Sequence, residues 1–251
     1  MTSTSVVLTG ASRGIGAALA RVLAKPGVRL ITLARRTDPE LQAYAAAQGA
    51  ALTQIDADLS DLAAAGAAAE RIAAELPRDA GRYLLINNAG TVHPVARGDQ
   101  LEDAGAITAA LNLNVGAVML LTARFLAATQ GLPADRRVLN ISSGAGRNPN
   151  PGWGVYCATK AALDMYTRVL KQEQGAGGAR VVALAPGVVD TDMQGAIRAS
   201  DPAAFPALSR FQDLHASGKL SAPANVAARI AAYLDRDDFG QTEIDDIRNY
   251  D

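Results

Sequence analysis

A tyrosine and a lysine four residues apart, Tyr156 and Lys160, have the greatest potential for chemistry in this chain. Residues 161–170 contain alanine, leucine and methionine and no helix breaker, so we expect a helix, on which positions four apart share a face. A free tyrosine holds its proton at neutral pH. A neighbouring ammonium favours the phenolate and would bring the phenol towards a pKa at which it exchanges a proton with a substrate. Because this spacing also arises by chance on surface helices, whether the pair is functional has to be judged from the surrounding elements.

The elements that must position this pair alternate between strand and helix. The 251 residues, 49% of them hydrophobic and 20% charged, suffice for one large α/β domain and are few for two. Strands are expected at 5–9, 28–34, 51–55, 83–86, 137–141 and 179–185, with an edge strand and a short polar tail within 239–251. Helices are expected at 17–25, from after 59 to about 76, in two pieces over 101–130, at 152–174 and at 223–234. The alternation predicts a parallel, doubly wound sheet of about seven strands with helices on both faces, in a single domain spanning 1–251.

One segment lacks this regularity. Residues 194–221 show no strong hydrophobic period and include several prolines, serines and glycines. Such composition is typical of a mobile insert that closes over a substrate. We therefore expect a substrate lid at about 191–221.

A glycine-rich turn joins the first strand to the first helix. Its glycines are Gly10, Gly14 and Gly16. A strand, a glycine turn and a helix in this order direct the amides at the helix N-terminus towards a phosphate, and glycine permits the close approach of a pyrophosphate. The spacing differs from the general G-x-G-x-x-G fingerprint, so the turn alone is a weak indication of a nucleotide site.

The residues after the second strand indicate which dinucleotide would bind. An NAD site usually places a carboxylate there for the ribose hydroxyls, whereas arginine accommodates a 2′-phosphate. Here Arg35 and Arg36 follow the strand, the first carboxylate is Asp38, and Arg13 adds a cation within the glycine turn. These arginines either solvate a loop or select a phosphorylated cofactor, and the pattern favours NADPH.

Two further features bear on a cofactor cleft. Asn88, Ala89 and Gly90 follow the fourth strand, where small and amide residues let the backbone lie against a cofactor. Residues 106–123 carry no charge, but asparagines and threonines, Asn114 among them, interrupt the stretch. We therefore expect a helix buried in the core or in a subunit interface rather than a membrane span.

Composition excludes several other classes of function. A net charge of −1 shows no excess of positive charge of the kind that binds nucleic acid or an anionic membrane. The single cysteine, Cys157, excludes an internal disulfide framework, and with the well-separated His93 and His215 it makes a metal site improbable. The N-terminal residues show no signal-peptide pattern, so we expect a cytoplasmic protein.

Taken together, these motifs resemble the short-chain dehydrogenase/reductase family over nearly the whole chain. The motifs that carry the resemblance are residues 9–16, residues 87–90, Asn114, Ser143, Tyr156, Lys160 and the pair Pro186 and Gly187. The resemblance implies a Rossmann fold that binds NADPH or NADP+ and reduces a small carbonyl compound. It also implies a homodimer or homotetramer, formed through the helices around Asn114 and Tyr156.

The resemblance also assigns roles to individual residues. Tyr156 is similar to the proton donor, Ser143 to the group that hydrogen-bonds the substrate oxygen, and Lys160 to the lysine that binds the nicotinamide ribose and lowers the tyrosine pKa. Asn114 is similar to the asparagine that holds a water in the proton relay, and Ser142 is the nearest competitor for the serine role. Together with the arginines, these are the expected cofactor contacts: Gly10, Ser12, Arg13, Gly14, Ile15, Gly16, Arg35, Arg36, Asp58, Leu59, Asn88, Ala89, Gly90, Tyr156, Lys160, Pro186, Gly187, Val189, Thr191 and Met193.

Within the family, the chain resembles the branch of sepiapterin reductases and bacterial benzil reductases. The resemblance rests on residues 186–194, on the end of the insert at 218–220 and on the C-terminal strand and tail. In sepiapterin reductases a C-terminal aspartate anchors the pterin, and Asp245 or Asp246 matches it. Gln241 and Thr242 stand where the family usually has Ser-Gly, so a pterin and a hydrophobic ketone or 1,2-diketone remain open as substrates.

Trp153, three residues before Tyr156, either lines the substrate cleft beside Ser143 and Tyr156 or packs in the core. Two other functions compete with the carbonyl reductase. One is an NAD-dependent alcohol dehydrogenase of the same family, against which the missing carboxylate after the second strand argues. The other is a non-catalytic NADPH-binding regulator, since fold does not determine function. Such regulators commonly lose the tyrosine or the lysine, and this chain keeps both.

Overall fold

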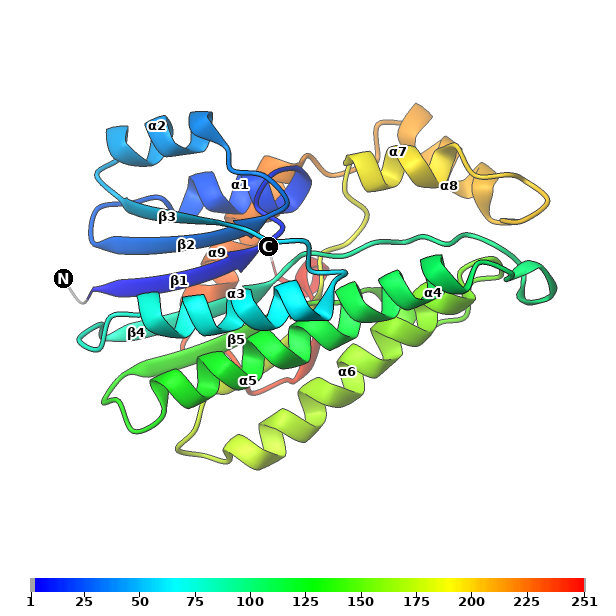
Figure 1. The fold of residues 1–251 in the computed structure, drawn as a ribbon. Helices are drawn as coiled ribbons and strands as arrows, with labels where there is room; N and C mark the ends of the chain where they lie inside the picture. The colour runs from blue at the N-terminus through cyan, green and yellow to red at the C-terminus, as the bar shows by residue number, and fades with distance from the viewer. Residues whose placement is uncertain (1–2, 251) are drawn as a thin grey trace.

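The computed structural model describes residues 3–250 and contains one seven-stranded parallel sheet, whose strand order is β3-β2-β1-β4-β5-β6-β7 (Figure 1). The strands are β1 Thr4–Thr9, β2 Val28–Ala34, β3 Ala51–Asp56, β4 Arg82–Asn87, β5 Asp135–Ile141, β6 Arg180–Ala185 and β7 Ile244–Asp246. The order reverses between β1 and β4, which is the switch point where ligands bind in doubly wound sheets. The predicted doubly wound fold is confirmed. Asp251, expected in a polar tail, lies outside the described residues.

Helices cover both faces of the sheet. They are α1 Gly14–Leu23, α2 Pro39–Ala47, α3 Leu62–Glu75, α4 Ala104–Leu111, α5 Ala117–Thr129, α6 Gly154–Gln174, α7 Asp192–Arg198, α8 Leu208–Ala216 and α9 Pro223–Asp235. Helices α1, α2 and α9 contribute to one hydrophobic cluster, and α3, α5 and α6 to the cluster on the opposite face.

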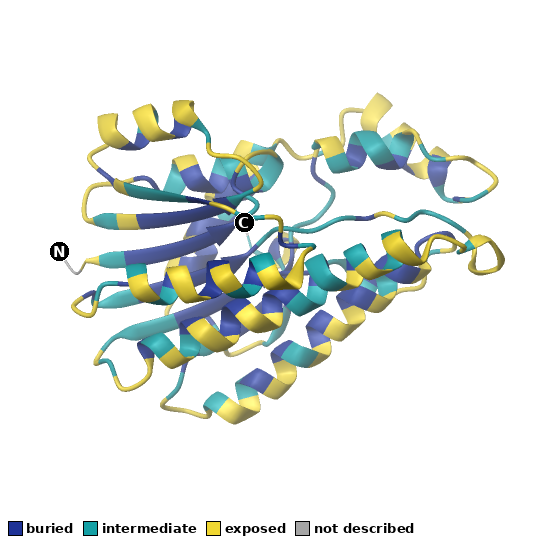
Figure 2. Ribbon diagram, in the orientation of Figure 1, coloured by how far each residue is buried: buried dark blue, intermediate teal, exposed yellow. Residues whose placement is uncertain are grey.

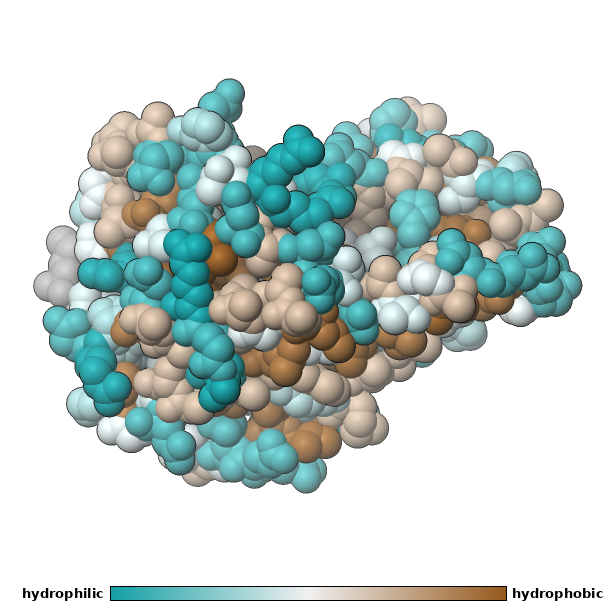
Figure 3. Space-filling view, in the orientation of Figure 1, coloured by the Kyte–Doolittle hydropathy of each residue, from teal (hydrophilic) through white to brown (hydrophobic). Residues whose placement is uncertain are grey.

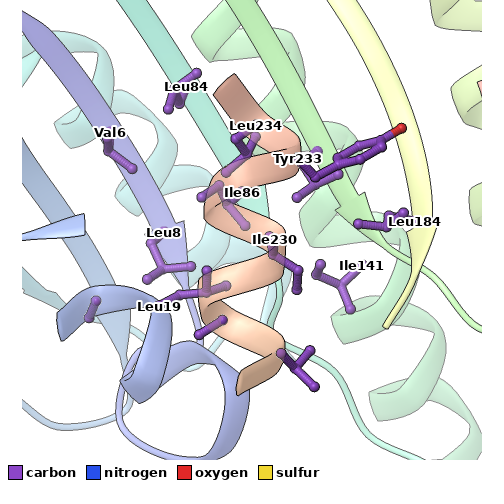
Figure 4. Packing of buried hydrophobic residues seen from close by; sticks show 14 of the residues in the cluster. Val6, Leu8, Leu19, Leu84, Ile86, Ile141, Leu184, Ile230, Tyr233 and Leu234 are labelled. Atoms are coloured by element: carbon purple, nitrogen blue, oxygen red, sulfur yellow. The ribbon is translucent and has the colours of Figure 1, made fainter. Parts of the chain in front are cut away.

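The core lies between the sheet and these two helical layers. Because both faces of the sheet are covered, the central strands are apolar and buried along nearly their whole length (Figure 2). In Figure 4, Ile230 and Leu234 of α9 pack on Leu8 of β1 and Ile86 of β4. This packing leaves the carboxyl ends of the strands as the place where polar residues gather.

Helix α2 was not expected from the sequence. It begins at Pro39, and the carboxylate of Asp38 accepts hydrogen bonds from the amides of Glu40 and Leu41. An N-cap aspartate followed by proline is a strong start signal for a helix and could have revealed it.

The two helices expected at 101–130 form one continuous helical stretch with a π-helical turn at Asn112–Gly116. This stretch, Ala104–Thr129, is long enough to cross a membrane, and its most apolar 18-residue window has a mean hydropathy of 1.7. Core helices of globular proteins meet the same criterion, and here Val118, Leu121 and Phe125 are buried against the protein's own core.

The segment expected as an irregular insert contains two helices, α7 and α8, which lie beyond the carboxyl ends of the strands (Figure 1). Its hydrophobic residues Ile197, Phe205, Leu208 and Phe211 are buried. The helices are short, and at this length an amphipathic period is too brief to recognise in a sequence.

Candidate active site

Two cavities lie at the carboxyl ends of the strands. The first, here the glycine-turn cavity, has a volume of about 400 Å³ and is lined by residues 10–16 and the ends of β2 and β4. The second, here the Trp153 cavity, has a volume of about 490 Å³ and is lined by Trp153, the ends of β5 and β6, helix α7 and the C-terminal residues. The residues that line both cavities are Ile15, Ser142, Tyr156, Pro186, Thr191 and Met193. Tyr156 therefore lies where the two cavities meet.

Helix α6 places Lys160 one turn after Tyr156, as the spacing predicts. Lys160 lines the glycine-turn cavity, and its Nζ donates a 2.8 Å hydrogen bond to the carbonyl of Ile141. Ser143 lines the Trp153 cavity, and its hydroxyl is hydrogen-bonded to the phenol of Tyr156. The phenol is thus hydrogen-bonded to the hydroxyl of Ser143, and the ammonium of Lys160 lies 5.7 Å from the centre of its ring.

The pKa values of the pair differ from the expected pattern. Burial raises the pKa of Tyr156, and its hydrogen bond with Ser143 only partly opposes this. The expected lowering of the tyrosine pKa by Lys160 is not found. The ammonium is directed at Ile141 and lies 5.7 Å from the centre of the phenol ring. Burial also lowers the pKa of Lys160 to about 8, and the nearby carboxylate of Asp164 acts in the opposite direction.

The geometry separates the two candidate serines. Ser142 is buried, and its hydroxyl donates a 2.5 Å hydrogen bond to Asp164. Ser143 begins the short helical turn Gly144–Gly146, and its hydroxyl accepts a hydrogen bond from the amide of Ala145. The hydroxyl of Ser143, and not that of Ser142, lies beside Tyr156.

Asn114 lies in the π-helical turn and is buried. Its side-chain oxygen accepts a hydrogen bond from the amide of Thr91, and its nitrogen donates to the carbonyl of Thr91 and to the hydroxyl of Thr159. The side chain therefore joins the segment after β4 to helix α6. It lines neither of the two cavities, and its expected role in a proton relay remains a prediction.

Most of the predicted cofactor contacts lie together in the glycine-turn cavity: Gly10, Ser12, Arg13, Gly14, Ile15, Gly16, Arg35, Asp58, Leu59, Asn88, Ala89, Gly90, Tyr156, Lys160, Pro186, Thr191 and Met193. Three do not. Arg36 lines a separate small hollow between β2 and the glycine turn. Gly187 and Val189 lie between β6 and helix α7, and they line the Trp153 cavity.

The glycine-turn cavity has the features that a phosphorylated dinucleotide requires. Helix α1 begins there at Gly14 with no capping side chain and no acidic residue in its first turn, so its amides can receive a phosphate. Glycine is required at position 16, because a Cβ would lie 2.0 Å from the carbonyl oxygen of Gly10. Arg35 lines the cavity, whereas the carboxylate of Asp38 is engaged at the start of α2. The site therefore suits a 2′-phosphate better than a free ribose hydroxyl.

An aromatic cluster forms one wall of the Trp153 cavity. The Trp153 ring stacks on that of Phe205, with centroids 4.8 Å apart, and lies edge-on to Tyr156 at 5.5 Å. Phe211 also packs on Trp153, at 5.3 Å. Phe211 lines the cavity, whereas Phe205 supports Trp153; both belong to the segment expected as a lid, so this segment forms part of the cavity wall.

The two C-terminal aspartates differ in position. Asp246 lines the Trp153 cavity and forms a two-pronged ion pair with Arg248. Asp245 lines neither cavity: it is buried and accepts hydrogen bonds from the hydroxyls of Tyr233 and Tyr250, at 2.9 and 2.5 Å. This placement corrects the expectation that Asp245 binds substrate. Its side chain points to the opposite face of β7 from that of its neighbour, as alternation along a strand requires.

Comparison with known proteins identifies the family. The model of the short chain dehydrogenase family matches residues 4–202. The chain is 38% identical to a benzil reductase ((S)-benzoin forming) of Bacillus cereus, over 95% of this chain and 97% of the relative. It is also 38% identical to the sepiapterin reductase of Rattus norvegicus, over 93% of this chain and 92% of the relative. The chain belongs to the short-chain dehydrogenase/reductase family.

Solved structures of short-chain dehydrogenases show the same arrangement. The KRED1-Pglu enzyme superposes with a TM-score of 0.81 at 29% identity, covering 95% of this chain and 98% of that one. A short chain dehydrogenase from Burkholderia cenocepacia J2315, solved in complex with NADP, gives a TM-score of 0.74 at 29% identity and covers 96% and 94%. The resemblance predicted from the motifs is confirmed, and the relatives include both of the expected groups.

Gln194 and Arg210 line the Trp153 cavity as part of the segment expected as a lid, although neither was singled out, and Arg248 lines it without having been expected there. Gln194 directly follows Met193, a predicted contact, and it ends the motif at 186–194 and begins the irregular insert; these sequence signals pointed to it. The two arginines lie on α8 and in the C-terminal segment, and only the folded chain brings them to the cavity.

Proposed function

We propose that the protein is an NADPH-dependent carbonyl reductase that converts a ketone or 1,2-diketone to the corresponding alcohol. The observation that carries this proposal is the position of Tyr156 at the junction of two cavities. Lys160 lies on the side of the cleft that suits a phosphorylated dinucleotide, and Ser143 on the side with aromatic walls. A carbonyl held between these groups can receive a hydride from one side and a proton from the other.

Bound in the glycine-turn cavity, NADPH would supply a hydride for the carbonyl carbon and be released as NADP+. Ser143 and Tyr156 hold the carbonyl oxygen by hydrogen bonds, and the hydroxyl of Tyr156 gives its proton to that oxygen. Its raised pKa keeps the phenol protonated before the reaction, so a proton is available at neutral pH. Lys160, Arg35 and the N-terminus of α1 hold the cofactor, and the positioned hydrogen bonds provide most of the rate enhancement.

The shape and lining of the Trp153 cavity support an aromatic ketone as substrate. Its wall of Trp153 and Phe211 is apolar and suits aryl groups. The relatives named benzil reductase and sepiapterin reductase differ in whether the ketone bears aryl groups or a pterin. Asp246, the remaining candidate for a pterin anchor, is already paired with Arg248, and this favours the aryl diketone.

We also propose a cytoplasmic homodimer or homotetramer with small molecules, and neither nucleic acid nor membrane, as its partners. Apolar side chains are exposed on one helical layer, among them Leu111 of α4, Leu120 of α5 and Met165 of α6. Figure 3 shows apolar surface over α4 and α5. A second copy of the chain would cover this surface.

The proposal is tested by following NADPH absorbance with purified protein and a panel of benzil, sepiapterin and a simple aryl ketone, each repeated with NADH. We expect rapid consumption of NADPH with benzil and slower reaction with NADH. Faster turnover of sepiapterin than of benzil would indicate a pterin reductase. Tight binding of NADPH without turnover of any ketone would contradict the proposal and favour a regulator.

A further inference from the structure

Two buried polar side chains in the Trp153 cavity lack hydrogen-bond partners. Gln194 is 3% exposed and Trp153 is 6% exposed. Within residues 3–250, neither the side-chain oxygen nor the side-chain nitrogen of Gln194 has a partner, and the same holds for the indole nitrogen of Trp153. Both residues line the cavity.

Such groups require an explanation. Nearly all buried polar groups in folded proteins are hydrogen-bonded, because leaving one unpaired is destabilising. Leucine in place of Gln194 would avoid this cost. A polar group kept there at the expense of stability is typical of a binding site, where the ligand supplies the partner.

The missing partner is on the substrate side. Met193 lines both cavities, but Gln194 and Trp153 line only the Trp153 cavity. The cofactor contacts expected from the family end at Met193, so they leave these two side chains unassigned. Ser143 and Tyr156 already provide the hydrogen bonds that one carbonyl oxygen needs.

The Trp153 side chain is held by aromatic contacts, and the backbone of Gln194 is held in a helix. Trp153 is stacked on Phe205 and lies edge-on to Tyr156, which places the indole close to the reacting phenol. Gln194 lies in the first turn of α7, where its backbone amide donates to the hydroxyl of Thr191, the N-cap residue. Donors with restricted motion lose little conformational entropy when a ligand binds.

We propose that the side-chain amide of Gln194, together with the indole N–H of Trp153, binds a second oxygen of the substrate, so that the enzyme selects ketones bearing a vicinal oxygen, as in a 1,2-diketone. This inference rests on the proposed carbonyl reductase function and names the specificity of that site. Two N–H donors match the two lone pairs of a carbonyl oxygen. A substrate without that oxygen leaves them unpaired, and a site built for a hydrogen bond discriminates strongly against such an analogue.

Benzil and deoxybenzoin test this inference. Deoxybenzoin has the carbon skeleton of benzil with one carbonyl replaced by a methylene, so the pair differs in the oxygen in question. The measured quantity is the ratio of kcat/KM for benzil to kcat/KM for deoxybenzoin, with NADPH, in the wild type and in variants. Comparing the ratio between proteins cancels the difference in intrinsic reactivity of the two ketones.

In Gln194→Leu we expect the ratio to fall about tenfold, as the loss of one good hydrogen bond implies. Trp153→Phe keeps a stacked ring without the N–H, and the ratio should fall in the same direction. Ile197→Ala is the matched control: it enlarges the same cavity from the same helix without changing a polar group, so both substrates should be affected alike. Thermal unfolding of each variant checks that it is folded.

Two outcomes contradict the inference, and they are distinguishable. If the wild type reduces both ketones and Gln194→Leu leaves the benzil-to-deoxybenzoin ratio of kcat/KM unchanged, the amide of Gln194 does not bind the second oxygen. The proposed reductase function would then still stand. If the wild type reduces neither ketone with NADPH, the proposed function fails and this inference fails with it.

Discussion

The phenol of Tyr156 is the group whose loss should separate chemistry from binding. Tyr156→Phe keeps the ring at the junction of the cavities but removes the proton that the carbonyl oxygen needs. We expect turnover of benzil to fall by roughly 10²–10⁴-fold, the usual contribution of a positioned proton donor. Binding of NADPH, measured by fluorescence titration, should remain close to that of the wild type. Retained turnover would show that another group donates the proton, and loss of both properties would indicate a folding defect.

Lys160 should make stability depend on pH. Its pKa is about 8 in the folded chain and 10.5 when exposed, so between these values the unfolded chain binds the extra proton and stability rises with pH. A shift of this size corresponds to about 3 kcal/mol at roughly 1.36 kcal/mol per pKa unit. We expect the free energy of unfolding, from urea titrations across that window, to rise less in Lys160→Met than in the wild type. Parallel curves for the two proteins would contradict a lowered pKa for the buried lysine.

Arg35 should determine the choice of cofactor. It lines the cleft near the end of β2, whereas Asp38, the first carboxylate after it, caps the start of α2 and lines a separate hollow. In Arg35→Ala we expect the KM for NADPH to rise about tenfold, the effect of losing one charge-assisted hydrogen bond. The KM for NADH should change little. An equal rise for both cofactors would show that Arg35 does not contact the 2′-phosphate.

The site residues that could be identified from the sequence are those whose positions relative to one another are determined by a single helix or loop. Tyr156 and Lys160 lie on one helix, and the glycines of the first turn lie on one loop, so spacing alone places them. Gln194 and Asp245 could not be assigned in this way. Whether a polar side chain faces a cavity or the interior depends on packing against distant elements. Gln194 lines a cavity whose other walls follow β5 and β6, and Asp245 is buried against Tyr233 of α9.

Among the elements, the start of the catalytic helix α6 packs closely against the segment that covers the cavity, through Gly152. The φ of Gly152 is +90°, and a Cβ would lie 2.3 Å from the carbonyl oxygen of Ala204, next to the buried Phe205. Gly152→Ala must therefore move this segment away from Trp153. We expect a higher KM for benzil, measured by steady-state kinetics, with little change in the KM for NADPH.

Gly218→Ala is the control for this prediction. Gly218 also has a positive φ, of +65°, but no atom of another part of the chain lies within 4 Å of the position that a Cβ would take. Both variants carry the backbone cost of roughly 1–2 kcal/mol for a left-handed residue with a side chain. Only Gly152→Ala carries the clash. If the two variants raised the KM for benzil equally, contact between the segment and Gly152 would not shape the cavity.

The elements that the sequence predicted well are long or strongly patterned. The central strands β1, β4 and β6 are nearly continuous runs of buried residues, most of them apolar, and α6 is 21 residues long. Helices α7 and α8 were not expected, because their 7 and 9 residues provide barely two turns of pattern. Their stability comes from tertiary packing of residues such as Phe211, and this is not visible in local propensity.

Across the complete chain, alternation of strand and helix was enough to predict the sheet and the edge at which its polar residues meet. It could not predict the cavities. The wall of the Trp153 cavity combines Ser143 after β5, Gln194 on α7 and Arg248 near the C-terminus. These residues are distant in sequence, and only the crossing order of β5, β6 and β7 brings them together.

The surface of α4, α5 and α6 leads to a prediction about assembly. Met165 and Val169 of α6 are 55% and 43% exposed, and Met119 and Leu120 of α5 are 39% and 38% exposed. Apolar side chains gathered on one helical layer are typical of a surface that a partner covers. We expect light scattering after gel filtration to give two or four times the chain mass of 25.9 kDa.

A charge in this layer should weaken the assembly. Met165→Glu places a carboxylate where a second copy would bury it unpaired, a cost of several kcal/mol in an interface. Ala46→Glu adds the same charge to the exposed surface of α2, on the opposite face of the sheet, and serves as the control. We expect Met165→Glu alone to shift the mass towards a single chain and to lower the thermal midpoint at low protein concentration, because folding and association are linked. A wild-type mass of one chain at every concentration would show that this apolar layer is not a subunit interface.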